Sequence, residues 1–194
     1  MKKSKLLGGV LVLVLAACGM ISSPPIENPF GLAGQQTQVS LGPSSQATGN
    51  LSVNATFNDA TLNLPVTPTG FNYNLAVQNV SFSGCPSTPP QTVSVSMSVT
   101  ATVSDNPSSG PRSATASASN VQFTLTQSGS GYTVSNITGG TLSFSNLQTL
   151  LDILQNGGQN TANLSGTVST TSNPDLAGCT MTITWGGGQG VLKF

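Results

Sequence analysis

The chain has 194 residues, of which only five are Lys or Arg and five are Asp or Glu, and it contains no histidine. The lack of histidine excludes Ser-His and Cys-His hydrolysis and removes the commonest metal ligand. Three of the basic residues lie within the first five positions, so the rest of the chain has no basic patch that would favour nucleic acid as a partner.

The first element is an N-terminal leader. Lysines in Met1–Lys5 precede the run Leu6–Leu15, which is apolar apart from two glycines. This order is typical of a secretory signal peptide. The run is too short for a spanning helix, which needs roughly 20 apolar residues to cross about 30 Å of hydrocarbon. We therefore predict that residues 1–17 are a cleaved signal peptide.

The leader ends in Leu15-Ala16-Ala17-Cys18, a block that resembles the lipobox of bacterial lipoproteins. The resemblance implies that diacylglycerol is attached to the Cys18 thiol, that cleavage occurs just before this residue, and that the membrane is a partner through the lipid anchor. The following Gly19, in place of the Asp that retains some lipoproteins at the inner membrane, favours the outer membrane or the cell surface. The alternative is ordinary secretion with a free Cys18 thiol.

Residues 18–49 are rich in Ser, Pro, Gly and Gln, and they show only a weak apolar pattern near Val39 and Leu41. Segments of this composition are typical of linkers. We predict a lipidated cysteine followed by a flexible tether over 18–49, and a single β domain over 50–194.

From Leu51 onward, apolar and hydroxylated residues alternate with a period of two, which indicates half-buried antiparallel strands. Residues 93–103 give the clearest case, with Val, Met or Ala at odd positions and Ser or Thr at even ones. The other predicted strands cover 51–57, 71–82, 114–127, 132–135, 141–145, 162–171, 179–185 and 191–194.

Two of these strands change phase, at Gln78-Asn79 and at Ser119-Asn120. We predict a β-bulge at each position, because one extra residue shifts which side chains face the core. The alternative at each is a break into two shorter strands. Bulges bend long strands, which favours a barrel or a coiled sandwich.

One segment departs from the β pattern. Leucines at 147, 150, 151 and 154 recur at helical spacing, and Asn156-Gly157 follows them. The spacing predicts a short amphipathic helix over 146–156. The fold class is therefore all-β, an antiparallel sandwich or partly closed barrel of about 8 to 10 strands with one short helix.

Cys85 and Cys179 are the two cysteines beyond the leader. Because extracytoplasmic proteins keep disulfides, we predict a Cys85–Cys179 bond, which requires the strands near 80 and 180 to lie together. Two buried free thiols are the alternative.

The chain offers no catalytic constellation. Asp59, Asp105 and Asp175 lie in turn-forming runs and Asp152 in the predicted helix, which indicates turn or surface roles. Neither a calcium loop nor zinc-ligand spacing is present, and the glycines at 186–190 indicate a turn. We therefore predict no catalytic residue, metal or cofactor.

The predicted strands carry almost no charge before Lys193, although exposed sheet edges are usually guarded by charged residues. Such edges are closed, covered by loops or paired with a partner. The leading hypothesis is a non-enzymatic envelope lipoprotein with a structural or interaction role and an envelope protein partner. The alternative is a carrier of a lipid or another apolar ligand between sheet and helix, by architectural analogy. A transmembrane barrel is less favoured because only ten residues are aromatic.

Overall fold

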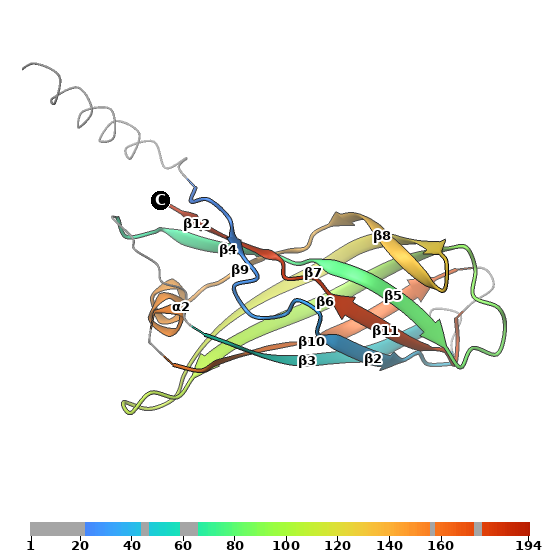
Figure 1. Ribbon diagram of the computed structural model, residues 1–194, viewed down its shortest axis with the longest axis horizontal. Coiled ribbons are helices and arrows are strands. Elements are labelled where there is room, and N and C mark those ends of the chain that lie inside the picture. Colours follow the sequence, from blue (N-terminus) through green and yellow to red (C-terminus); the bar gives the residue numbers. More distant parts are fainter. Residues whose placement is uncertain (1–21, 44–46, 59–65, 156–157, 173–175) are drawn as a thin grey trace, which may run out of the picture.

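The computed structural model describes residues 22–43, 47–58, 66–155, 158–172 and 176–194 (Figure 1). The described strands form two antiparallel sheets, and alternating apolar residues on each strand form the core, as the fold class predicted. The larger sheet has eight strands in the order β2 (Gln36–Ser40), β11 (Thr180–Trp185), β5 (Val77–Ser83), β8 (Gly131–Thr138), β7 (Arg112–Ser128), β6 (Thr92–Asp105), β10 (Asn160–Thr171) and β3 (Ala47–Phe57).

The smaller sheet lies at one end of the larger one, where helix α2 (Leu147–Leu154) also lies (Figure 1). The predicted helix is thus confirmed, and its buried face packs into the core. No described helix has the length and apolar content required to cross a membrane. The order of the smaller sheet is β1 (Ile26–Glu27), β12 (Gln189–Lys193), β4 (Gly70–Asn74) and β9 (Thr141–Ser143).

The larger sheet curls into a nearly closed barrel, whose seam lies between the terminal strands β2 and β3. At one end of the seam, the backbone N–H of Gly42 donates to the carbonyl of Thr48 over 2.8 Å. Further along, a side chain at position 49 would overlap Val39, so only glycine allows the strands this close. Close approach at the seam therefore replaces a continuous backbone ladder.

A buried hydrogen-bond chain crosses the same seam. The indole Nε1–H of Trp185, on β11, donates to Oγ1 of Thr37 over 2.9 Å, and the Thr37 hydroxyl donates to the carbonyl of Ser52 over 3.4 Å. Trp185 and Thr37 are both buried. Because a buried polar group without a partner is costly, this chain fixes β2 against both neighbours.

We expect Thr37→Val to lower the free energy of unfolding by about 1 to 3 kcal/mol, because it leaves the Trp185 indole N–H buried without an acceptor. Trp185 is the only tryptophan, so denaturant unfolding followed by its fluorescence measures the loss directly. Thr37→Ser keeps the hydroxyl and is the matched control. Equal stability of the two variants would contradict a role for the hydrogen bond.

The predicted bulge at Ser119-Asn120 is confirmed. Met97 pairs with Val121 and Val99 with Ala118, so β7 has one more residue than β6 between these pairs. Asn120 has a φ of 69°, a left-handed conformation that asparagine tolerates. The bulge lets both halves of the 17-residue strand β7 present apolar side chains to the interior.

The predicted strand 71–82 is corrected by the structure. A register shift does occur at Gln78, since Val77 pairs with Trp185 and Asn79 with Thr184. However, the chain also breaks at Leu75 and Ala76, so that β4 belongs to the smaller sheet and β5 to the barrel. Backbone groups at the break form hydrogen bonds with other segments. The Leu75 N–H donates to the Gly140 carbonyl, and the Ala76 carbonyl accepts from the Gly186 N–H.

The prediction of a tether over 18–49 is wrong for the part that the structure describes. Phe30, Leu32, Val39 and Leu41 are buried in the core, and β2 pairs with β11 from Gln36 to Ser40. The domain therefore includes residues 22–43, and it begins earlier in the chain than the predicted start at residue 50. The predicted signal peptide and Cys18 lie outside the described residues.

Phe30 is the centre of an aromatic cluster between the smaller sheet and the end of the barrel. Its ring centroid lies 4.8 Å from that of Tyr73, 5.6 Å from Phe144, 5.8 Å from Phe57 and 6.0 Å from Phe71. These four rings come from β3, from β4 and from the segment after β9. Burial raises the pKa of Tyr73, whose hydroxyl donates to the Gly187 carbonyl over 3.0 Å.

The predicted disulfide is present and joins Cys85 to Cys179. Ser83 pairs with Thr180 in the adjacent ladder, so the bond fastens the end of β5 to the start of β11. In Figure 1 these strand ends lie opposite the end that carries α2 and the smaller sheet.

Candidate functional site

The acidic residues of the described chain are engaged in structural contacts. Asp105, which the sequence places in a turn, ends β6 and is buried, and its carboxylate forms an ion pair with Arg112. The Arg112 Nε–H donates to Asp105 over 3.0 Å, and this hydrogen bond is the main cause that raises the pKa of Arg112. Asp152, in α2 as predicted, lies 4.0 Å from the same guanidinium. The contacts of Arg112 with Asp105 and Asp152 attach α2 to the β6–β7 hairpin.

Glu27, in the smaller sheet, accepts a hydrogen bond of 2.9 Å from the Gln189 side chain. Asp59 and Asp175 lie outside the described residues. In the part of the chain that the structure describes, no three potential metal ligands come together. Among the residues that the structure describes, the acidic side chains singled out in the sequence therefore do not form a reactive site.

The barrel wall is interrupted between β5 and β8. Their pairing is limited to Val80 opposite Tyr132, and the next backbone contact toward the smaller sheet is the Leu75–Gly140 hydrogen bond. Between these two contacts, the described strands share no ladder. We call this opening, bounded by Leu75–Val80 and Tyr132–Gly140, the window.

The direction of the β8 backbone leaves hydrogen-bonding groups facing the window. Gln127 of β7 donates its N–H to Gln91, away from β8. In an antiparallel ladder, the backbone groups of two paired residues point either toward each other's strand or both away from it. Tyr132 is paired with Gln127, so its backbone groups point away from β7. Backbone direction alternates along a strand, so the backbone groups of Val134, two residues later, also point away from β7. Tyr132 meets Val80, but no described strand pairs with Val134 on that side.

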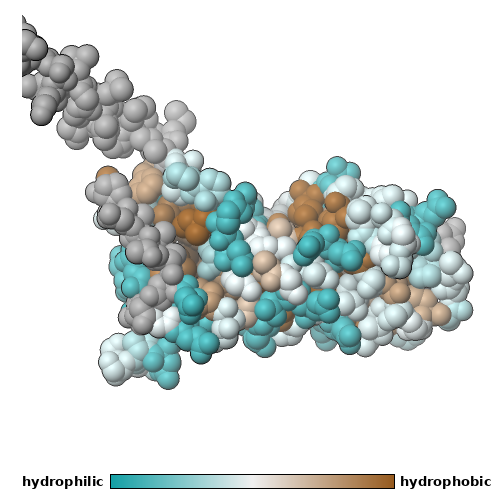
Figure 2. All heavy atoms as spheres, viewed as in Figure 1, coloured by the Kyte–Doolittle hydropathy of each residue, from teal (hydrophilic) through white to brown (hydrophobic). Residues whose placement is uncertain are grey.

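Ile137 lies in the window and is exposed. A second bulge, in which Asn136 has a φ of 56°, carries β8 away from the regular ladder at this point. Gly140 is near Ile137, Leu75 and Val121, which places Ile137 beside the interior. Even so, 38% of its surface is exposed, and only Val66 is more exposed among the large apolar residues that the structure describes. Figure 2 shows an apolar patch over this part of the barrel.

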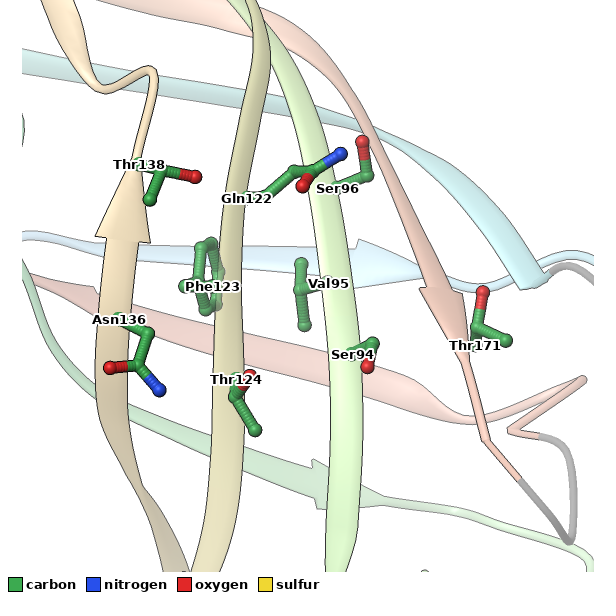
Figure 3. Close-up of a pocket in the computed structure, with 9 residues that line it drawn as sticks. All are labelled: Ser94, Val95, Ser96, Gln122, Phe123, Thr124, Asn136, Thr138 and Thr171. Atoms are coloured by element: carbon green, nitrogen blue, oxygen red, sulfur yellow. The ribbon is translucent and has the colours of Figure 1, made fainter.

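A polar groove of about 410 Å³ lies on the outer face of the neighbouring strands (Figure 3). Gln122 reaches from β7 over β6 toward Ser96, while Asn136 and Thr138 project from β8 (Figure 3). Asn136 and Thr138 therefore border the groove, and Ile137 between them lies in the window. None of the residues that line the groove is charged; they are Ser94, Val95, Ser96, Gln122, Phe123, Thr124, Asn136, Thr138 and Thr171.

The sequence did not single out Ile137, because its exposure depends on how β5 and β8 diverge. One signal was available, since Asn136 is an asparagine within a β segment, and asparagine is favoured at bulges that need a positive φ. Burial raises the pKa of Tyr132, whose hydroxyl donates to the Pro90 carbonyl over 2.6 Å at the far end of the window.

The comparisons with known proteins leave the family open. No protein-family model matches the chain, and no curated protein shows significant similarity to it.

Proposed function

We propose that the chain is a non-enzymatic, lipid-anchored protein of the bacterial cell envelope, at the outer membrane or the cell surface, that binds an envelope protein partner through the window. The observation that carries this proposal is the exposed Ile137 on the same strand as Val134, whose backbone is paired with no described strand on the window side. Apolar side chains next to free strand edges are the features that an added β-strand uses for binding.

The chemistry of the surroundings restricts the partner. The window supplies half-buried Val77 and Val134 in addition to Ile137, and the adjoining groove supplies hydroxyl and amide groups without charge. An apolar centre with a neutral polar rim is typical of protein interfaces. The partner is therefore expected to present an extended, uncharged segment whose apolar side chain covers Ile137.

The interior supports interaction over lipid carriage. The α2 side chains Leu150, Ile153 and Leu154 are fully buried against the sheets. Inward positions of the barrel strands are likewise filled by Val, Leu, Phe and Met side chains. Binding of a lipid in the barrel would have to displace this packing, whereas a partner at the window would not.

Site-specific photocrosslinking in intact cells tests the proposal. We expect a photoreactive amino acid at position 137 to form a discrete protein adduct, because this residue contacts the partner. The same amino acid at Thr115, exposed on the outer face of β7 and outside both window and groove, is expected to form none. Equal yields at the two positions would contradict the proposal.

A charge variant provides the second test. With the photoreactive amino acid at Asn136, Ile137→Asp is expected to abolish the adduct, because a carboxylate buried without a partner opposes binding. Thr115→Asp introduces the same charge on the same sheet and is expected to preserve it. Thermal unfolding of both variants shows whether the fold is retained, and an adduct that survives Ile137→Asp would overturn the assignment of the window.

A further inference from the structure

The chain enters the fold almost immediately after the proposed lipid anchor. Ser22 forms a β-bridge with Lys193, and the Ser23 N–H donates to the Leu192 carbonyl over 2.9 Å. In return, the Leu192 N–H donates to the Ser23 hydroxyl over 3.0 Å. Residues 22 and 23 are therefore fixed to β12, and the chain that follows is part of the domain.

This attachment limits how far the domain can lie from the bilayer. Ser22 lies four positions after Cys18 in the sequence. A fully extended chain covers at most about 3.6 Å per residue, so the connection spans at most about 14 Å. The polar headgroup region of one leaflet is itself roughly 5 to 8 Å thick. A domain attached by so short a connection contacts the headgroups with the end that carries Ser22.

The residues at that end suit a membrane surface. The N–H of Thr69 donates to the Lys193 carbonyl over 2.7 Å, which brings the segment before β4 beside β12. Val66 in this segment has 52% of its surface exposed, the highest value among the large apolar side chains described. Within the described segments 22–26, 66–70 and 191–194, Lys193 is the only charged side chain, and its sign suits anionic lipid.

We propose that the end of the molecule formed by residues 22–26, 66–70 and 191–194, here called the anchor end, is a docking surface for the lipid bilayer. This inference rests on the proposed lipidation of Cys18 and goes beyond it, because it fixes the orientation of the domain. The β7–β8 turn at Ser130 lies at the opposite end of the barrel (Figure 1). In this orientation the turn projects away from the membrane. The window, along the side wall, remains open to a partner.

Depth-dependent quenching tests this orientation. In the lipidated full chain, Cys85 and Cys179 are bonded to each other and Cys18 is acylated, so Val66→Cys and Ser130→Cys each introduce one free thiol. Each variant is labelled with an environment-sensitive fluorophore in vesicles of phosphatidylethanolamine with a minority of phosphatidylglycerol. Lipids bearing a spin-label quencher near the headgroup are expected to quench position 66 severalfold more than position 130.

Intact-mass measurement of the same samples separates the two proposals. If Cys18 is acylated and both labels respond alike, the docking surface is overturned while the lipid anchor stands. If the mass shows no acylation, the proposed anchor fails and the orientation fails with it. Within that first outcome, strong quenching at both positions would indicate a domain lying on its side, and weak quenching at both would indicate a domain held off the bilayer.

Discussion

Replacing Phe30 by alanine is expected to lower the free energy of unfolding by about 3 to 5 kcal/mol, as for other large aromatic residues in protein cores. The ring is 1% exposed and packs against four other aromatic rings. Its loss removes aromatic contacts between the smaller sheet and the end of the barrel. Urea unfolding of the purified domain measures the effect.

The surroundings of Phe30 leave little room for relaxation. The adjacent Gly31 has a φ of 67°, and a Cβ there would lie 2.5 Å from the Thr56 carbonyl oxygen. The backbone beside Phe30 thus lies close against β3, and this close approach opposes its movement into the space that Phe30 leaves. Cavities that cannot collapse are at the costly end of the range for such substitutions.

Gln38→Ala is the matched control, because Gln38 lies in the same N-terminal segment but is exposed on β2. We expect a change within about 0.5 kcal/mol for this surface substitution. A chain that begins after residue 41 is expected to lose cooperative unfolding, since it lacks both Phe30 and β2. If Phe30→Ala were as stable as Gln38→Ala, the segment would be a tether after all.

The sequence predicted those features whose signal is local. The bulge at Ser119-Asn120 changes the phase of a long alternating strand, and the α2 leucines repeat at helical spacing, so both are visible in neighbouring residues. The disulfide prediction rested instead on the expected extracytoplasmic compartment and on the presence of only two cysteines beyond the predicted leader. Each of these predictions agrees with the structure.

The N-terminal segment was misjudged because its contribution to the core is sparse. Four buried apolar side chains, Phe30, Leu32, Val39 and Leu41, are separated by small and polar residues, and β2 buries only two of its five residues. Such a composition is typical of linkers. Its place in the fold depends on residues far along the chain, since β2 pairs with β11 and β1 with β12.

The window could not be predicted for a similar reason. Alternation identifies β5 and β8 as strands but does not tell where two strands stop pairing. Their divergence follows from the transfer of the chain between sheets at Leu75-Ala76 on one side and Gly139-Gly140 on the other. Exposure of Ile137 is a result of that topology, and its sequence context resembles that of buried isoleucines.

Removing the disulfide is expected to be the other large perturbation. Cys85 and Cys179 are 94 positions apart, and in the chain-entropy model closing a loop of this length is worth about 4 to 5 kcal/mol. We expect the double variant Cys85→Ser and Cys179→Ser to lose roughly 2 to 5 kcal/mol, the usual range for native disulfides. The urea midpoint should fall, and the dependence on urea should steepen because the unfolded chain becomes less compact.

The native state should change little in this variant. The Leu41 N–H donates to the Cys179 carbonyl over 2.9 Å, and the Gly178 N–H donates to the Leu41 carbonyl over 3.1 Å. These backbone bonds and the Ser83–Thr180 pair hold β2, β5 and β11 together without the sulfur atoms. The loss therefore arises mainly in the unfolded state, and the position 137 crosslink should be retained in the folded double variant.

Reductant distinguishes this account from an effect of the serine side chains. Dithiothreitol is expected to shift the urea midpoint of the wild-type protein toward that of the double variant and to leave the double variant unchanged. If thiol titration shows that the disulfide has been reduced and the wild-type midpoint still does not change, an entropic role for the bond is contradicted. Because the bond needs an oxidising compartment to form, the same comparison predicts lower stability for protein made in a reducing cytoplasm than for protein exported to an oxidising compartment.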